Sequence, residues 1–217
     1  MNRLVAALFD QKSLGVFTTV DIVHAVAGSD AARYSLVKRA LADGDLIRIK
    51  RGLYMLPHRY RKVEVSAHTI SSMIVAQSYM SLESALSYYG WIPEAVRSVT
   101  AVTSKNSVEY HTPVGHYTYT RVAQRTFFAG VRRIDEGDGN VWALATPLKA
   151  LADYVYVHRL DWDSSQPLTR SLRIEREDIS SLTERDFLEL EGVYTNTRVV
   201  TFLARLREEV CGGRSHH

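Results

Sequence analysis

The stretch Ser29–Leu56, SDAARYSLVKRALADGDLIRIKRGLYML, predicts a short amphipathic helix that runs directly into a basic β-hairpin. Asp30 can cap the helix through its side-chain oxygen, and Ser29 is a second candidate. Gly44 then ends the helix, because glycine tolerates the left-handed conformation that follows a helix C-terminus. Four apolar residues share one helical face and are expected to point inward: Leu36, Val37, Ala40 and Leu41.

The hairpin that follows carries cations at its tip. Two strands are expected on either side of a turn closed by Arg51 and its glycine neighbour. Ile47 and Ile49 should face one side of the hairpin, and Arg48 and Lys50 the other. A helix of this kind fits a DNA major groove, and a basic hairpin can reach the adjacent phosphates. The pattern is therefore typical of a winged helix-turn-helix.

The helix face opposite the apolar one supplies the candidate base and phosphate contacts. Ser35, Lys38 and Arg39 offer hydrogen-bond donors there, and Tyr34 lies at the flank. Arg33 projects onto the apolar side, so it is interpreted either as a contact at the margin or as a side chain packed over the core edge. The alternative for the whole face is a solvated basic helix. The predicted DNA-contacting set is Arg33, Tyr34, Ser35, Lys38, Arg39, Arg48, Lys50 and Arg51.

Charge is distributed unevenly along the 217 residues. Residues 1–62 hold 11 of the 27 Lys and Arg but only 5 of the 24 Asp and Glu, whereas residues 63–217 hold 16 basic and 19 acidic side chains. The basic surplus therefore coincides with the predicted wing, where a patch of one sign would attract phosphates. The alternative is that the basic segment at 58–62 merely solvates a linker.

Composition favours an ordinary globular protein of the cytoplasm. Hydrophobic residues make up 46% of the chain and charged residues 24%. No apolar run approaches the roughly 20 residues that cross a bilayer, and no secretory leader is recognised at the N-terminus. A single cysteine, Cys211, cannot form an internal disulfide, which favours a reducing compartment.

The predicted elements give an α+β fold. Helices at 2–13 and after Thr18 or Thr19 precede the stretch above, and Pro57 stops the hairpin, so residues 1–62 form the winged helix-turn-helix domain. Residues 63–217 are expected to form a larger mixed α/β domain, whose mainly antiparallel sheet is flanked by helices. The boundary is placed near 58–65, and a tail at about 211–217 is expected to be disordered.

Within the second domain, most elements follow from periodicity and capping signals. Helices are expected over 63–77, after Ser81, after Thr146 with Pro147 at the first position, and near 184–190 and 196–210. The helix after Thr146 should bury the stripe Leu148, Leu151, Ala152 and Val155. Residues 159–174 are expected to be irregular. Strands are expected at 99–103, 108–112, 117–122, 127–134 and 141–145.

No pattern of catalytic or metal-binding residues emerges. The chain contains no P-loop, no G-x-S-x-G elbow and no G-x-G-x-x-G. The eight histidines show no ligand spacing, and the pair His111 and His116 matches no common site. The twelve tyrosines could form a stacking platform, although core and interface roles are favoured. We therefore expect no enzyme activity, no cofactor and no metal.

Three segments resemble the AbiEi family of antitoxins from type IV toxin–antitoxin (abortive infection) systems. They are RYSL with the following GDLI and RGLY (residues 33–36, 44–47 and 51–54), YMSLESALSYYG with IPE (79–90 and 92–94), and ATPLKALAD (145–153). The resemblance covers about residues 1–159. The last two segments are the more specific ones, because many regulators share the first.

The resemblance implies a transcriptional repressor with two separable roles. The winged helix would bind inverted repeats in the double-stranded DNA of its own promoter, and the C-terminal domain would neutralise a nucleotidyltransferase-like toxin without forming a stable complex. Two alternatives stay open. One is a hydrolase or nuclease targeted by the winged helix, and the other is a winged helix that binds protein rather than DNA.

Overall fold

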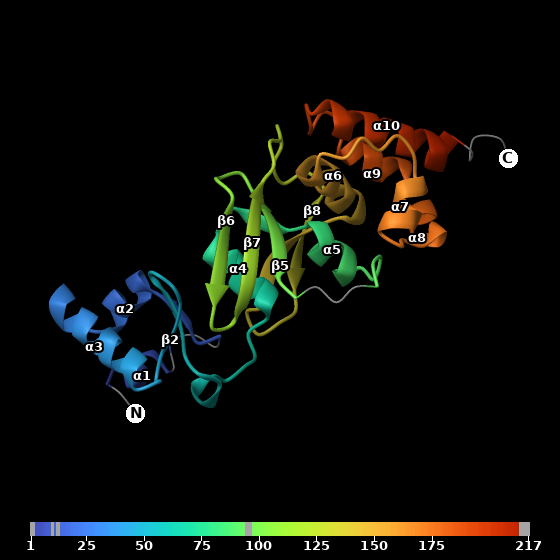
Figure 1. Cartoon of the computed structure of the whole chain (residues 1–217). Coiled ribbons are helices and arrows are strands. Elements are labelled where there is room, and N and C mark those ends of the chain that lie inside the picture. The colour runs from blue at the N-terminus through green and yellow to red at the C-terminus, as the bar shows by residue number, and fades with distance from the viewer. Residues whose placement is uncertain (1–2, 10, 12–13, 94–96, 213–217) are drawn as a thin grey trace.

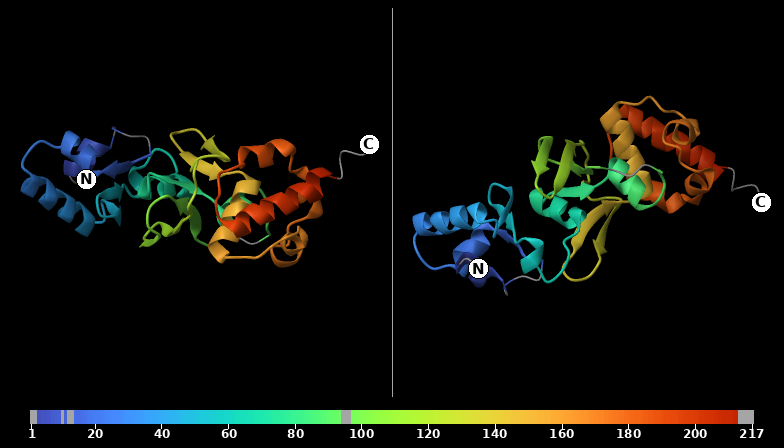
Figure 2. Two further views of the ribbon diagram at one scale, coloured as in Figure 1. Left: turned by 90° about the horizontal axis from the view of Figure 1, so that it is seen from above. Right: turned by 60° about the horizontal axis from the view of Figure 1, so that its bottom comes forward.

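The computed structural model describes residues 3–9, 11, 14–93 and 97–212. Three regions follow one another in a row, with the N-terminal helices at one end, a large sheet in the middle and the C-terminal helices at the other end (Figure 1). Two further views show the same succession (Figure 2). We refer to residues 3–62 as the N-terminal part and residues 63–212 as the C-terminal part.

The N-terminal part consists of three helices and a small antiparallel sheet. Its elements are α1 (Arg3–Leu8), β1 (Val16–Thr18), α2 (Thr19–Ala25), α3 (Asp30–Ala42), β2 (Ile47–Lys50) and β3 (Leu53–Met55). The strand order is β1-β3-β2. Strand β1, which the sequence analysis did not predict, pairs with β3 so that Val16 lies opposite Met55. Of the helix expected at 2–13, positions 2, 10, 12 and 13 fall outside the described residues, and α1 ends at Leu8.

An apolar cluster of its own holds the N-terminal part together. The inward face of α3 contributes Val37 and Ala40, as predicted, with Leu36 and Leu41 partly buried around them. The remaining buried members come from α1, β1, α2 and the segments flanking the sheet: Leu4, Val5, Leu8, Phe17, Ile22, Val26, Leu46 and Leu56.

The connection to the C-terminal part is short. A 3-10 turn, η1 (His58–Tyr60), follows the buried Pro57, and helix α4 (Ala67–Ile74) begins after Ser66. The helix expected over 63–77 is therefore shorter than predicted. Residues 63–66 lie outside the helix, and strand β4 (Ser78–Met80) follows it.

A six-stranded mixed sheet forms the centre of the C-terminal part. The order is β6-β7-β5-β4-β9-β8, and three of the five strand pairs are antiparallel. The other strands are β5 (Val99–Thr103), β6 (Val108–Thr112), β7 (Gly115–Arg121), β8 (Val131–Asp135) and β9 (Val141–Ala145). The strand expected at 127–134 begins only at Val131, because residues 127–130 form a turn.

Helices flank this sheet and extend away from it. Helix α4 packs on β4, β5 and β9, and α5 (Leu82–Tyr88) packs on β5 and α6 (Pro147–His158). Beyond α6 lie α7 (Gln166–Ser171), α8 (Arg176–Ser181), α9 (Glu184–Glu189) and α10 (Thr197–Cys211). The expectation of an irregular segment at 159–174 is thus wrong for α7, and Cys211 belongs to a helix rather than to a disordered tail. Residues 213–217 lie outside the described residues.

These elements confirm the α+β class: an N-terminal helical region with a small sheet, followed by a larger sheet-containing part. A second apolar cluster joins the two parts. It combines β-sheet residues of the N-terminal part with residues of α4, β5 and β7. None of the helices in the described part of the chain is long and apolar enough to cross a membrane.

Candidate nucleic-acid interface

Helix α3 is fixed at both ends by local signals. Ser29, rather than Asp30, is the N-cap: its hydroxyl oxygen accepts a hydrogen bond from the backbone N–H of Ala32 at 3.3 Å. Asp30 instead pairs with Arg33. Gly44 follows the helix with φ +67°, the left-handed conformation that glycine adopts at low cost.

The outer face of α3 is exposed as predicted. Tyr34 is 68% exposed, and Ser35, Lys38 and Arg39 are exposed as well. The Ser35 hydroxyl donates to the carbonyl of Ala31 at 2.9 Å, so the donor predicted there is engaged within α3 and the exposed hydroxyl is left as an acceptor. This face therefore offers two cations, a hydroxyl and an aromatic ring on one stretch of helix.

Arg33 packs over the edge of the core, which was one of its two interpretations. Its Nε donates to the carbonyl of Val26 at 2.9 Å, and its Nη1 donates to Asp30 at 2.8 Å. The side chain is only 19% exposed. Arg33 thus ties the start of α3 to the end of α2, and these donors are already occupied.

The hairpin β2–β3 contains a β-bulge. Because of it, the Lys50 side chain points to the opposite side of the hairpin from the one predicted. Arg48 lies opposite Tyr54, but Lys50 lies opposite Leu53, so Ile49 is the extra residue. A bulge interrupts the alternation of side chains along a strand. The Lys50 ammonium consequently lies against the C-terminal part, where it donates to the carbonyl of Ile74 at 2.5 Å. The expectation that Arg48 and Lys50 point the same way is wrong.

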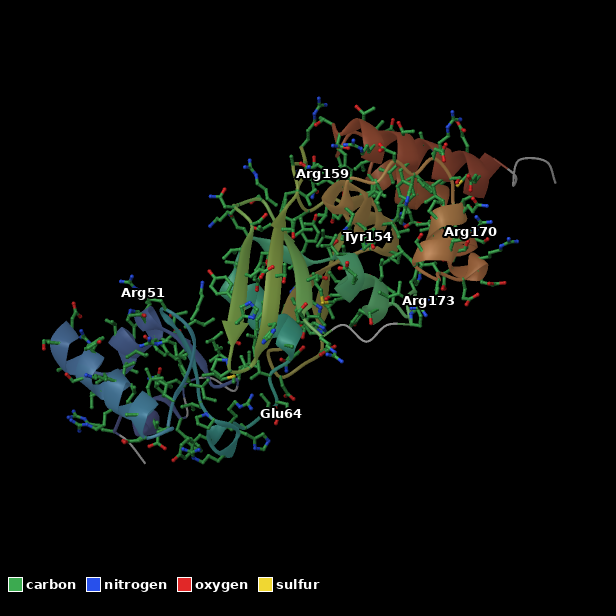
Figure 3. The ribbon with its side chains drawn as sticks, in the orientation of Figure 1. Arg51, Glu64, Tyr154, Arg159, Arg170 and Arg173 are labelled. Atoms are coloured by element: carbon green, nitrogen blue, oxygen red, sulfur yellow. The ribbon has the colours of Figure 1, made fainter. Side chains whose placement is uncertain are left out.

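The surroundings of Lys50 also affect its charge. Its ammonium lies 5.7 Å from the centre of the Tyr110 ring, a cation–π distance. Partial burial, and to a lesser extent the nearby Lys105 cation, lower the pKa of Lys50 below its usual value. Arg51, the next residue, behaves differently: it is exposed at the hairpin tip (Figure 3).

Four predicted cations have no partner of opposite charge. Lys38, Arg39, Arg48 and Arg51 form no ion pair within the residues that the structure describes, and all four are exposed. Two acids of this region are engaged elsewhere, because Asp30 holds Arg33 and Asp45 holds Arg59 at 2.8 Å. The four cations lie on α3 and at the hairpin, so these two elements carry exposed positive charge.

An apolar groove, which the sequence analysis missed, lies beside this face. It has a volume of about 260 Å³ and is lined by Thr19, Ile22, Val23, Asp30, Arg33, Tyr34, Val37 and Tyr54. Val20 is 62% exposed and Val23 is 40% exposed on the adjoining helix α2. The backbone N–H of Thr19 donates to the carbonyl of Gly52 at 3.0 Å, which holds the start of α2 against the hairpin tip. Apolar groups in such a place can contact thymine methyls.

A buried polar cluster in the C-terminal part was also missed. Asp153, fully buried on α6, accepts hydrogen bonds from Tyr79 at 2.9 Å, Ser81 at 2.8 Å and Tyr194 at 2.7 Å. Ser81 precedes α5 as predicted, but its hydroxyl is used here rather than as a cap. Lys149, one turn earlier on α6, donates to Gln124.

The two charged members of this cluster are perturbed by burial. Desolvation lowers the pKa of Lys149 to about 8, against the opposing effect of Asp153. Desolvation likewise raises the pKa of Asp153. The ammonium of Lys149 lies 4.5 Å from the Tyr194 ring centre and 5.5 Å from that of Tyr79. Both charged residues come from the segment ATPLKALAD, so a lysine and an aspartate four residues apart in an apolar helix were the available signal.

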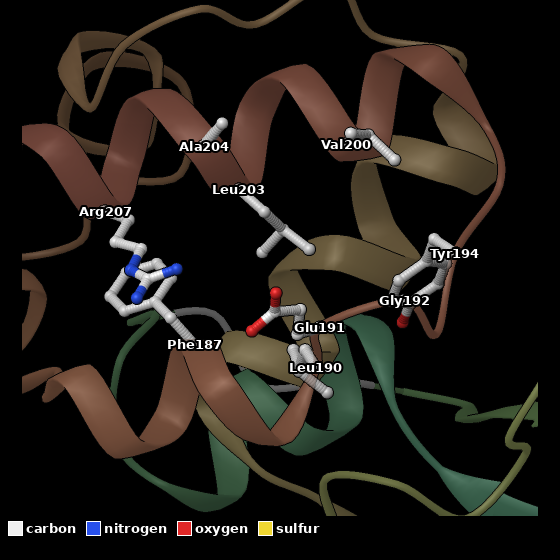
Figure 4. A pocket seen from close by; sticks show the side chains of 9 residues that line it. All are labelled: Phe187, Leu190, Glu191, Gly192, Tyr194, Val200, Leu203, Ala204 and Arg207. Atoms are coloured by element: carbon white, nitrogen blue, oxygen red, sulfur yellow. The ribbon is translucent and has the colours of Figure 1, made fainter.

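The described residues also contain a second pocket and a pair of facing histidines. A small, mostly apolar pocket of about 170 Å³ lies between α9 and α10, with Arg207 and Glu191 among its lining residues (Figure 4). Among the described residues, no three His, Cys, Asp or Glu side chains gather in a way that could hold a metal ion. His111 and His116 face each other across β6 and β7, with ring centres 4.6 Å apart. Tyr117 and Tyr119 are buried core residues.

A known family model matches the part of the chain that carries the exposed cations of α3 and the hairpin. Residues 3–57 match the family model described as transcriptional regulator, AbiEi antitoxin. The match begins at α1 and ends just after β3, so it includes every predicted DNA-contacting residue. Among curated proteins, none matches the chain.

The AbiEi match confirms the resemblance over the N-terminal part and points to a transcriptional regulator of the antitoxin kind. The segments at 79–94 and 145–153, which also suggested the family, lie outside the matched residues.

Proposed function

We propose that the chain is a sequence-specific DNA-binding repressor of its own operon and the antitoxin of a type IV toxin–antitoxin system. Residues 1–62 would be the DNA-binding domain, and residues 63–217 the domain that counters a nucleotidyltransferase-like toxin without a stable complex. The observation that carries the DNA-binding half is the exposed face of α3 and the hairpin. Its four cations have no acidic partner among the described residues.

The arrangement supports a specific division of labour on DNA. Lys38, Arg39 and Ser35 would enter the major groove from α3, with Tyr34 at the groove wall. Lys38 and Arg39 would also neutralise the phosphates that border the groove, and Arg48 and Arg51 the phosphates beside it. Tyr34, together with exposed Val20 and Val23, would contact thymine methyls and so contribute to sequence preference.

Arg33 and Lys50 have different parts in this proposal. Both were predicted contacts, but their donors are engaged by Val26, Asp30 and Ile74. We therefore assign DNA contact to the other six residues of the predicted set.

Repression follows from where the protein would bind. Inverted repeats in the promoter would each receive one N-terminal domain, and occupied repeats would exclude RNA polymerase from the operon. A surplus of exposed cations favours DNA over a protein partner, because a phosphate backbone supplies the negative charge that neutralises it.

The test is titration of the full chain against a fluorescent duplex from the promoter upstream of its own gene. We expect tighter binding to this duplex than to a scrambled one of the same composition, and weaker binding as salt rises. Equal affinity for the two duplexes would contradict sequence-specific repression. No binding to either would contradict DNA recognition and favour a protein partner.

A test of the antitoxin half is independent of the first. Co-expression with a nucleotidyltransferase encoded in the same operon should restore growth that the enzyme alone arrests. Rescue should persist in the Lys38→Ala variant, which leaves the C-terminal part intact. Failure of the wild-type chain to rescue growth would contradict the antitoxin assignment alone.

A further inference from the structure

We propose that Lys50 is a positioning residue that latches the DNA-binding hairpin to the C-terminal part, so that the C-terminal part sets the orientation of the DNA-reading face. The inference rests on the proposed function, because it concerns how that face is held. It changes the role of a residue at the basic tip from phosphate contact to internal tether.

The first observation is the seat of the Lys50 side chain. Its ammonium donates to the Ile74 carbonyl at 2.5 Å and lies 5.7 Å from the Tyr110 ring centre. Both partners belong to the C-terminal part, on α4 and β6. The bulge at Ile49 produces this geometry, because it turns Lys50 to the same side of the hairpin as Leu53.

The chemistry of this seat suits a cation. Ile74 is the last residue of α4, and the final carbonyls of a helix have no partner within the helix. These carbonyls also carry the negative end of the helix dipole, which attracts a positive group. The aromatic face of Tyr110 adds a second attraction. To bind a phosphate instead, Lys50 would have to give up the Ile74 carbonyl, the helix dipole and the Tyr110 ring.

An apolar interface surrounds the latch. Ile49, Leu53 and Met55 of the hairpin are each only 3–4% exposed, and they pack against the C-terminal part. Their partners are apolar and aromatic residues of α4, β5 and β7: Ile70, Ile74, Ala101, Tyr117 and Tyr119. Separating the two parts would expose this surface to water, which is unfavourable.

The connecting segment is held as well. The Asn140 side chain accepts from the Ser66 backbone N–H at 2.9 Å and donates to the Glu64 carbonyl at 3.0 Å. Arg61, largely buried, lies 3.5 Å from the Glu64 carboxylate. Three kinds of contact therefore join the hairpin to the C-terminal part: the Lys50 hydrogen bond, the apolar interface, and the hydrogen bonds of Asn140 to the connecting segment. We infer that the two parts move as one body.

The decisive experiment compares two neighbouring cations by the salt dependence of DNA binding. In the full chain, Arg51→Met should flatten the plot of log affinity against log salt by about 0.9, because one phosphate contact is lost. Lys50→Met should weaken binding about tenfold, yet leave the slope unchanged, because it loosens the hairpin without removing a phosphate contact. A slope flattened equally by both variants would overturn the proposal.

A substitution in the other part tests the latch without touching any cation. Tyr110→Ala should weaken DNA binding severalfold without changing the slope of log affinity against log salt. Tyr110 lies on β6, outside the proposed DNA interface. Tyr88→Ala is the matched control, because this half-exposed tyrosine on α5 also packs against other aromatic rings but does not contact Lys50. Equal effects of both variants would overturn the latch.

Hydrogen exchange separates failure of the latch from failure of the proposed function. Lys50→Met should speed amide exchange at residues 47–55 in the absence of DNA, with exchange in α10 unchanged. That result supports the latch even if the wild-type chain binds no DNA, an outcome that contradicts only the proposed function. Unchanged exchange at 47–55 would overturn the latch whatever the DNA affinity.

Discussion

Charged side chains occupy opposite environments in the two parts of the molecule. On α3 and the hairpin, Lys38, Arg39, Arg48 and Arg51 stand in solvent, with no ion pair among the described residues. On α6, by contrast, Lys149 and Asp153 are fully buried and surrounded by hydrogen-bonding groups.

The buried and the exposed charges have different physical explanations. A buried charge without partners is costly, so the cluster around Asp153 is explained by internal structure. Exposed cations of one sign repel one another and gain little from the fold. A phosphate backbone would neutralise them, which is the role proposed for them.

The largest expected effect would come from disturbing the buried charges. Asp153→Asn removes the counter-charge of Lys149, so we expect the free energy of unfolding to fall by about 3–5 kcal/mol in urea titrations. Asp163→Asn, an exposed carboxylate, should change it by less than about 0.5 kcal/mol. A loss below about 1 kcal/mol for Asp153→Asn would remove the contrast between the two parts.

The exposed cations should show the reverse behaviour. Replacing Lys38 and Arg39 together by alanine should weaken binding to the promoter duplex by about 2–4 kcal/mol, because each contact contributes roughly 1–3 kcal/mol. The free energy of unfolding should stay within about 0.5 kcal/mol of wild type. Arg170→Ala is the control, because its side chain is exposed on α7 at the opposite end of the molecule (Figure 3). Unfolding of the double variant under native conditions would contradict a purely external role.

The pH dependence of the free energy of unfolding tests the burial of Lys149. Because the pKa of Lys149 is lowered to about 8 from 10.5, the unfolded chain binds more protons between these values. The free energy of unfolding should therefore rise from pH 8 to pH 10, by about 2 kcal/mol in total. Above pH 10, Tyr79 and Tyr194 reverse the trend, because burial raises their pKa values and the unfolded chain loses their protons first. Urea titrations of wild type and Lys149→Met at pH 8, 9 and 10 measure this rise in the free energy of unfolding. An equal rise in both would show that another group is responsible.

A smaller change is expected at the cap that begins α3. Ser29→Ala removes the hydrogen bond to the Ala32 N–H and should lower the free energy of unfolding by about 1 kcal/mol. Ser104→Ala, on the exposed turn after β5, should leave it within about 0.5 kcal/mol. Equal values for the two variants would rule out the cap.

The elements that dominate the sequence pattern were predictable. Helix α3 follows from its apolar periodicity and from Gly44, and α6 from Thr146, whose hydroxyl accepts from the Lys149 N–H at 3.4 Å. The three-residue strand β1 was missed because it is too short to show alternation. Helices α7 and α8 were missed because each has only six residues and no side-chain cap, whereas the equally short α9 begins with the capping box of Thr183 and Asp186.

The candidate site was predictable in its residue types but not in every direction. The outer face of α3 is exposed as expected, since a helix repeats every 3.6 residues without interruption. Lys50 could not be placed, because a β-bulge leaves no mark in the order of Ile, Arg, Ile and Lys. Lys149 and Asp153 are polar residues whose partners Tyr79 and Tyr194 lie far away in the chain, so local pattern could not reveal their burial.

We expect the four exposed cations of the N-terminal part to neutralise DNA phosphates. Titration of the full chain against its own promoter duplex at several salt concentrations measures how many phosphates are neutralised. If Lys38, Arg39, Arg48 and Arg51 each neutralise one phosphate, log affinity against log salt should have a slope near about −3.6, and alanine at all four should bring it close to zero. Salt-independent binding, or an unchanged slope in the fourfold variant, would contradict the claim.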